Sequence, residues 1–258
     1  MDVFFLGILA LGASVLTFYS GFGLGTILTP VFMVYFPAEI AIALTALIHF
    51  VNNIGKFALT WTYIDWKVVL QFGTSAVIFS LIGAWSLSYL ANDAYLYEFQ
   101  MGSSRIQVKT INGLIGVLVL IFTLLEWLPI AKKWQFSARW LTVGGALSGF
   151  FGGLSGFQGA LRSMFLRKLD LSKEAFISSG IAIACLIDIS RLGMYYDFIG
   201  NGLPHRSMVF IIVGSTAALA GAFLGNKLLK KMTLNRLQQV VSIALILFSI
   251  ALILGIIG

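Results

Sequence analysis

Apolar side chains dominate this chain in long runs that are separated by short polar segments. Six of the runs have roughly 20 residues each, which is the length that a helix needs to cross the hydrocarbon core of a bilayer. Tryptophan and tyrosine lie near several run ends, as aromatic residues do at membrane interfaces. The pattern predicts helical spans over Ile40–Trp61, Val68–Leu90, Lys109–Leu128, Ala175–Tyr195, Met208–Leu228 and Gln238–Ile257.

Two further apolar runs are too long for one span and contain glycine-rich interruptions. The run Val3–Phe36 is interrupted by Gly21–Gly25 and by Pro30. The run Ala138–Leu166 is interrupted by Gly152–Gly159. Glycine at this density disfavours a continuous helix, and non-helical backbone at membrane depth needs protein or a polar cavity to satisfy it. We therefore predict two shorter helices in each run, joined at a break and forming either two crossings or a re-entrant hairpin.

The two interrupted runs begin two similar halves of the chain. Ser20–Phe22 recurs as Ser155–Phe157, and the interval of 35 residues from Gly21 to Lys56 recurs from Gly156 to Arg191. Matching order, spacing and charge type indicate an internal duplication.

The duplication predicts the fold. Residues 1–130 would form the first membrane repeat and residues 131–258 the second. Each repeat would make five passes, and an odd number places the two in opposite orientations. The predicted fold class is therefore an all-α integral membrane protein with two inverted repeats of about five helices, each headed by a broken-helix or re-entrant hairpin. Inverted repeats with corresponding broken helices indicate a substrate site between the repeats.

The composition supports a membrane protein and excludes several other classes. The chain is 59% hydrophobic and 10% charged, whereas soluble domains carry about 25% charged residues. The net charge of +7 resides in short loops, so no basic surface remains that could bind nucleic acid. Cys185 is the only cysteine and there are two histidines. We therefore expect no metal site and no enzyme activity.

Loop charges predict the orientation. With two passes for each interrupted run, eleven basic residues fall on one side and three on the other. The basic side carries Lys67, Lys132, Lys133, Arg139, Arg167, Lys168, Lys173, Lys227, Lys230, Lys231 and Arg236. Because basic loops stay in the cytoplasm, both termini of this multi-pass protein are expected outside it.

The second interruption carries a candidate anion-binding centre. Arg162 is a charged side chain inside an apolar run, and such residues usually face a cavity or a partner. Gln158 lies four residues earlier on the same helix face. The half-helix after each break would direct free backbone N–H groups and a positive dipole end at the break. A structural clamp on backbone carbonyls is the alternative for Arg162. The predicted ligand-binding residues at the breaks are Gly23, Gly25, Thr26, Gln158, Gly159, Arg162 and Ser163.

Two further groups of polar residues lie within apolar runs. His49, Asn52, Asn53 and Lys56 share one helical arc through their three- and four-residue spacings. We predict that these four residues line the same cavity, with Asn52, Asn53 and Lys56 as the candidate substrate contacts, although Lys56 near a span end could instead extend to the interface.

Asp188 and Arg191 are spaced to pair directly. They form either a structural ion pair or a functional one, in which Arg191 binds substrate and Asp188 accepts a coupling proton.

These segments resemble the sulfite exporter TauE/SafE family of membrane permeases over nearly the whole chain. Gly21–Pro30 and Gly149–Ser163 are similar to the hairpin at the head of each half in that family, and Gly221–Gly225 is similar to its small-residue helix motif. The resemblance implies transport of a small sulfur-containing anion across a bacterial-type plasma membrane without an organic cofactor.

The chain departs from the family pattern at the predicted site. Leu24 and Gln158 each interrupt what is usually a run of three glycines, and Arg162 stands where the family is usually apolar. The expected function is a secondary transporter (permease) for sulfite or an organosulfonate. The alternatives are a passive anion channel or a transporter of another small organic or inorganic anion. The expected partners are the anionic substrate and the lipid bilayer, and a homodimer is left open.

Overall fold

Most of the apolar runs form helices in the computed structural model, which describes residues 3–17, 23–92, 94–101, 104–128, 136–202, 207–228 and 235–257. Five helices in these ranges are long and apolar enough to cross a membrane. They are α3 (Ala38–Thr60), α4 (Trp66–Leu90), α5 (Thr110–Trp127), α9 (Lys173–Met194) and α11 (Ser207–Leu228). A sixth, α12 (Asn235–Ile253), has a shorter apolar part. The all-α membrane fold predicted from the pattern is confirmed.

Both interrupted runs form pairs of shorter helices, as predicted. The first run gives α1 (Val3–Thr17) and α2 (Leu24–Met33), and the second gives α7 (Leu141–Ser155) and α8 (Gly159–Leu166). Gly156 ends α7 with a left-handed φ of 85°, a conformation that glycine adopts without a Cβ penalty. Ser20–Phe22, in the first predicted break, lie outside the described residues.

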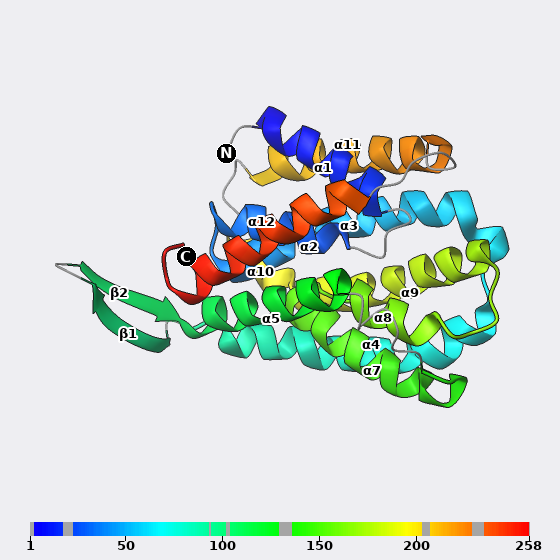
Figure 1. Ribbon diagram of the computed structural model, residues 1–258, viewed down its shortest axis with the longest axis horizontal. Coiled ribbons are helices and arrows are strands. Elements are labelled where there is room, and N and C mark those ends of the chain that lie inside the picture. The colour runs from blue at the N-terminus through cyan, green and yellow to red at the C-terminus, as the bar shows by residue number, and fades with distance from the viewer. Residues whose placement is uncertain are drawn as a thin grey trace.

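Each pair enters and leaves from one end of the molecule. In Figure 1, α1 begins and α3 follows α2 at the end that carries the two strands, whereas α7 begins and α9 follows α8 at the opposite end. At 1.5 Å per residue, the 10 residues of α2 and the 8 of α8 extend about 15 and 12 Å. Since a bilayer core is about 30 Å thick, the lengths favour re-entrant hairpins over full crossings.

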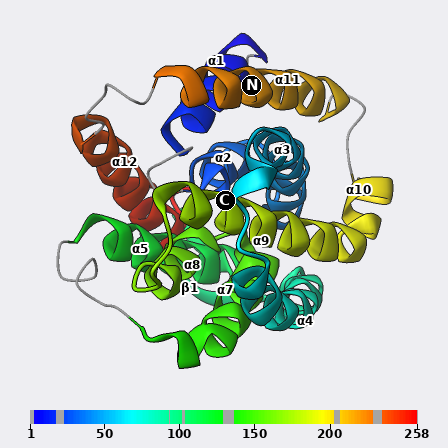
Figure 2. The same cartoon turned by 90° about the vertical axis from the view of Figure 1, so that its right-hand side faces the viewer.

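Helices from the two halves of the chain alternate in the bundle. α1 packs along α11, α4 packs along α7, and α5 packs along α12, while α3 and α9 meet near the centre (Figure 2). If α1 corresponds to α7 and α4 to α11, the α1–α11 contact is equivalent to the α7–α4 contact. Two related halves would pack in this way, and their inverted orientation stays a prediction.

Glycines allow α4 and α7 to approach closely. A Cβ added to Gly145, Gly149 or Gly153 would collide with the backbone carbonyls of α4. A Cβ on Gly83 would collide in the same way with the carbonyl of Phe150 on α7. Small residues at four-residue spacing have this role in membrane helices, and these glycines have it in the contact between α4 and α7.

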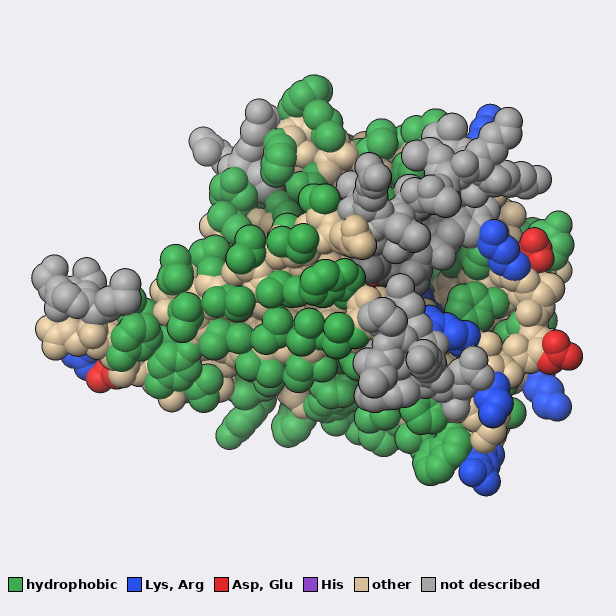
Figure 3. Space-filling model, in the orientation of Figure 1, with side chains coloured by type: hydrophobic (Ala, Val, Ile, Leu, Met, Phe, Trp, Pro, Cys, Tyr) green, Lys and Arg blue, Asp and Glu red, His purple; other side chains and the backbone are tan. Residues whose placement is uncertain are grey.

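The surface separates into an apolar middle and two charged ends. Figure 3 shows hydrophobic side chains covering the middle of the molecule, with most of the visible Lys and Arg residues at the end opposite the strands. The described basic residues of that end are Lys67, Arg139, Arg167, Lys168, Lys173 and Lys227. α1 begins and α12 ends toward the other end (Figure 1). This distribution agrees with the loop sides that the charge count predicted.

A β-hairpin was not predicted. Strand β1 (Tyr95–Met101) pairs with antiparallel β2 (Ser104–Lys109), and the pair projects from the helical bundle in Figure 1. Aromatic and branched residues alternate with polar ones in these strands, which is the usual strand pattern. Glu98 accepts hydrogen bonds from Arg105 Nη2 at 2.5 Å and from Gln107 at 3.1 Å.

The Glu98 contacts predict a pH response of the hairpin. The hydrogen bond from Arg105, with a smaller contribution from Gln107, lowers the pKa of Glu98 below its ordinary value of 4.5. A lowered folded-state pKa stabilises above pH 4.5, and this stabilisation is lost as the pH falls through the folded value. Amide hydrogen exchange in β1 and β2 should therefore be slower in the wild type than in Glu98→Gln at neutral pH, and equal in strong acid. A difference in exchange rate that persists in strong acid would show that the Glu98 carboxylate is not the stabilising group.

Candidate functional site

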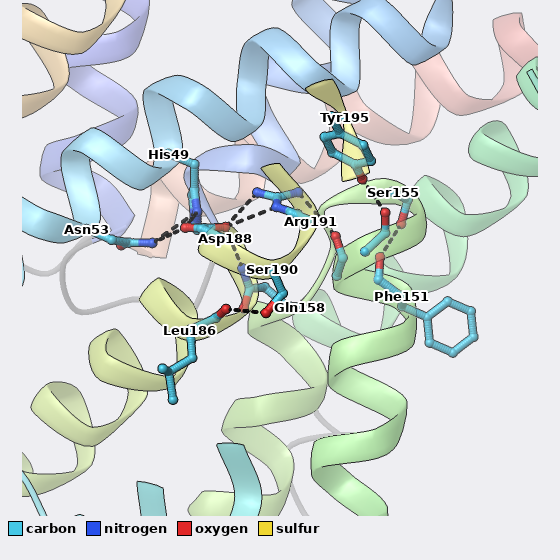
Figure 4. Close-up of polar contacts among 12 residues, drawn as sticks. His49, Asn53, Phe151, Ser155, Gln158, Leu186, Asp188, Ser190, Arg191 and Tyr195 are labelled. Atoms are coloured by element: carbon cyan, nitrogen blue, oxygen red, sulfur yellow. Dashed lines mark hydrogen bonds and ion pairs between the residues drawn. The ribbon is translucent and has the colours of Figure 1, made fainter. Parts of the chain in front are cut away.

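A buried carboxylate connects three segments of the bundle. Asp188, in the middle of α9, is fully buried. Its Oδ2 accepts from His49 Nδ1 at 2.7 Å and from Asn53 Nδ2 at 2.9 Å, both on α3. Its Oδ1 accepts from Gln158 Nε2, at the break between α7 and α8, at 3.2 Å. Figure 4 shows these side chains converging on Asp188 from separate helices.

Arg191 completes the carboxylate's partners and anchors the second break. Its Nε and Nη2 donate to Asp188 Oδ1 at 3.1 and 2.8 Å, and both side chains are fully buried. Its Nη1 donates to the carbonyl of Gly152 at 3.1 Å, which also accepts from the backbone N–H of the C-cap residue Gly156 at 3.0 Å. The hydroxyl of Tyr195 donates to the carbonyl of Gly153. These contacts connect the Asp188–Arg191 pair and Tyr195 to the end of the broken helix.

Gln158 links Arg162 to the hydrogen-bond network around Asp188. Because a carboxylate only accepts and a guanidinium only donates, the amide orientation of Gln158 is fixed: Nε2 faces Asp188 and Oε1 accepts from Arg162 Nη1 at 3.1 Å. The backbone carbonyl of Gln158 accepts from Ser148 Oγ at 3.0 Å. The head group of Arg162 is thus held by the network around Asp188.

A cavity of about 70 Å³ lies beside this network. One water needs roughly 10–15 Å³ on the same measure, so the cavity has room for several waters or one small polyatomic ion. Its wall contains Thr17, Gly23, Leu24, His49, Asn52, Asn53, Lys56, Arg162, Ser163, Leu166, Phe176, Ile177, Gly180 and Ile181. Thr17 and Leu166 are the last residues of α1 and α8, and Phe176 lies in the first turn of α9. The cavity therefore extends from the network toward the end with the basic loops.

The cavity wall is basic. Arg162 is cationic at any physiological pH, and Lys56 is a second basic group on the wall. The Lys56 Nζ lies 3.4 Å from the Thr17 hydroxyl, and 3.2 Å from the side-chain oxygen of Asn52 in that amide's favoured orientation. Within the described residues no carboxylate lines the cavity, and Asp188 behind it is paired with Arg191. This arrangement favours an anion.

The two glycine-rich breaks meet at the inner end of the cavity. A Cβ on Gly25, in the first turn of α2, would lie 3.3 Å from the carbonyl oxygen of Gly156. Gly23 is the N-cap residue of α2, and its backbone carbonyl accepts from Thr26 N at 3.0 Å. The contact brings the starts of both half-helices to the middle of the molecule, where the sequence placed the site.

The structure divides the predicted site residues into three groups. The cavity wall includes Gly23, Asn52, Asn53, Lys56, Arg162 and Ser163. The network behind it contains Gln158, Asp188 and Arg191. The first turns of the half-helices contain Gly25, Thr26 and Gly159, all buried away from the wall.

Sequence reasoning missed one contact and one wall of this site. His49 was recognised on the polar arc, but its contact with Asp188 joins residues 139 positions apart, and no local pattern predicts that. The α9 wall, formed by Phe176, Ile177, Gly180 and Ile181, reads as ordinary membrane helix. The sequence signal on this wall was Gly180. A Cβ at that position would lie 3.4 Å from Arg162 Nε.

Comparison with known proteins identifies one family. The profile described as Sulfite exporter TauE/SafE matches residues 6–252, nearly the whole chain. No curated protein and no solved structure matches the chain. The match confirms the resemblance that the glycine-rich segments carried.

Proposed function

Because the chain belongs to the sulfite exporter TauE/SafE family of membrane transporters, we propose that it carries a small sulfur-containing anion, such as sulfite or an organosulfonate, across the plasma membrane. One observation carries the proposal: a small cavity at the meeting point of two broken helices is lined by Arg162 and Lys56 and by no described carboxylate. A charge at membrane depth is retained when it serves a site or a pathway.

The chemistry of the wall suits a compact oxyanion. The Arg162 guanidinium is a planar fork of donors that matches two oxygens of a sulfonate or sulfite group. Lys56 supplies a basic amine, and Asn52 and Ser163 supply short polar groups at the same wall. Phe176 and Ile177 on α9 give the opposite wall an apolar surface that would accept a short organic substituent.

The position of the cavity suggests the direction of loading. It extends toward the end with the basic loops, and basic loops stay in the cytoplasm. The anion would therefore enter from the cytoplasm, with both termini and the β-hairpin outside it. Movement of one half against the other would then present the site to the opposite side.

Replacing Arg162 tests the proposal. Loss of one partner from a desolvated charge-assisted contact costs about 2–5 kcal/mol, which corresponds to at least a roughly 30-fold weaker binding. Sulfite, sulfate and methanesulfonate are added to detergent-purified protein, and binding is read as thermal stabilisation. A ligand at 100 times its wild-type Kd should stabilise the wild type by about 2.7 kcal/mol and Arg162→Ala by less than about 1 kcal/mol.

Arg167→Ala is the matched control, since Arg167 is the exposed C-cap residue of α8 one turn further on. It should respond as the wild type does. An unchanged response in Arg162→Ala, or no response of the wild type to any of these anions, would remove the anion site. Counterflow of the binding anion in liposomes would distinguish transport from a conducting channel.

A further inference from the structure

His49 has one ring nitrogen in the buried hydrogen-bond network, and the residue is also part of the cavity wall. Nδ1 lies 2.7 Å from Asp188 Oδ2, and the residue is part of the cavity wall. Asn53 Nδ2 lies 3.0 Å from Nδ1, but it already donates to Asp188 Oδ2 at 2.9 Å. A carboxylate can only accept, so Nδ1 carries a hydrogen.

The tautomer fixes what the other nitrogen can do. With the hydrogen on Nδ1, a neutral imidazole has its lone pair on Nε2. Nε2 has no hydrogen-bond partner among the described residues. A basic nitrogen therefore borders a cavity that also holds Arg162 and Lys56.

The charged and titratable groups described around His49 lie on three helices. On α9, Asp188 faces His49 directly and Arg191 lies beyond Asp188. Lys56 lies two turns along α3, and Arg162 faces the cavity from α8. The described residues of α1 and α2 on the wall, Thr17, Gly23 and Leu24, are uncharged.

Asp188 itself is poorly placed to accept a proton. Its two oxygens already accept from His49, Asn53, Gln158 and Arg191, and a protonated carboxyl would lose one of these contacts. The lone pair of Nε2 can gain a proton without breaking any of them. An anion in the cavity would also offset the added positive charge.

We propose that His49 Nε2 is a proton-binding site coupled to the anion site, so that anion and proton bind together. The inference rests on the proposed function. In the step, a hydronium ion or the acid form of the substrate loses a proton: its O–H bond breaks, the N–H bond forms on Nε2, and the anion remains beside the imidazolium and Arg162. Since binding linkage is reciprocal, the anion strengthens proton binding and the proton strengthens anion binding.

The coupling predicts a pH dependence with a definite sign. Sulfate and methanesulfonate keep their charge across the range where histidine titrates, between about pH 5 and 8. Their binding should become tighter by about ten-fold as the pH falls through this range, a typical coupling factor. In His49→Gln, where the amide can still donate to Asp188, binding of both anions should not vary with pH.

The chain offers a direct control because it has only two histidines. His205→Gln removes the other one and should keep the full pH dependence. It also leaves His49 as the sole imidazole, so nitrogen NMR of histidine-labelled protein reports on this ring alone. The expected spectrum shows hydrogen on Nδ1, with protonation of Nε2 when sulfate is added near neutral pH.

The outcomes separate the two proposals. Anion binding in the wild type that is independent of pH, or pH dependence that survives in His49→Gln, overturns the proton site and leaves the anion site standing. An Nε2 that stays unprotonated when sulfate binds overturns it as well, even if His49→Gln does not fold. Absence of anion binding at every pH overturns the proposed function and this inference together.

Discussion

Arg191→Met should be among the most destabilising single substitutions in this protein. The change leaves the fully buried Asp188 carboxylate without its guanidinium partner and removes the donor to the Gly152 carbonyl. Breaking a buried pair by removing one partner costs about 3–5 kcal/mol, because the remaining charge is uncompensated. Thermal unfolding of the purified variant in detergent measures the loss.

Two further variants show whether the pair itself is responsible. Arg105→Met removes an arginine from the exposed pair with Glu98, whose side chains are 68% and 46% exposed, and it should leave the unfolding temperature unchanged. The double variant Asp188→Leu with Arg191→Met removes both charges and should be more stable than Arg191→Met alone. A double variant that is no better than the single one would show that packing, not the unpaired charge, dominates.

Gly149→Leu should prevent the close packing of α4 and α7. The new Cβ would overlap the backbone carbonyl of Ala76, and backbone cannot rotate away as a side chain can. Overpacking a close contact costs at least about 1–3 kcal/mol, and here the helices must separate along the whole seam that Gly145, Gly149 and Gly153 form. The measurement is the yield of monodisperse protein and its unfolding temperature.

Gly193→Ala provides the opposite case. Gly193 lies in α9, and a Cβ there meets nothing within 4 Å. Since glycine costs a helix interior about 1 kcal/mol relative to alanine, this variant should be as stable as the wild type or more so. If both substitutions were equally tolerated, the α4–α7 contact would be looser than the structure shows.

The sequence predicted the fold well because membrane constraints are local. Where backbone meets lipid, a bilayer permits only helices or closed barrels, whose hydrogen bonds are satisfied internally, so apolar runs of about 20 residues were sufficient to predict helical spans. Glycine density was sufficient to predict the helix breaks. Most of the described basic loop residues lie at one end of the bundle, in agreement with the loop charge count. The β1–β2 hairpin was missed because it lies outside the apolar band, where none of these constraints act.

The site was only partly predictable, for a physical reason. Spacing along one helix identifies a shared face, and in this way Asn52, Asn53 and Lys56 were placed together. Contacts between helices have no such signal. The hydrogen bond of His49 to Asp188 depends on how α3 crosses α9, and packing of the whole bundle sets that crossing.

Helices of the first half pack against helices of the second half, so the order of synthesis affects how this protein folds. α1 ends at Thr17, but its long packing partner α11 begins only at Ser207. At roughly 5–20 residues per second of synthesis, the intervening chain takes on the order of 10–40 s to emerge. During that time the α1 face that will meet α11 has no final partner. Insertion and folding of this protein are therefore separate in time, and any membrane chaperone that protects it must act on the first half before the second exists.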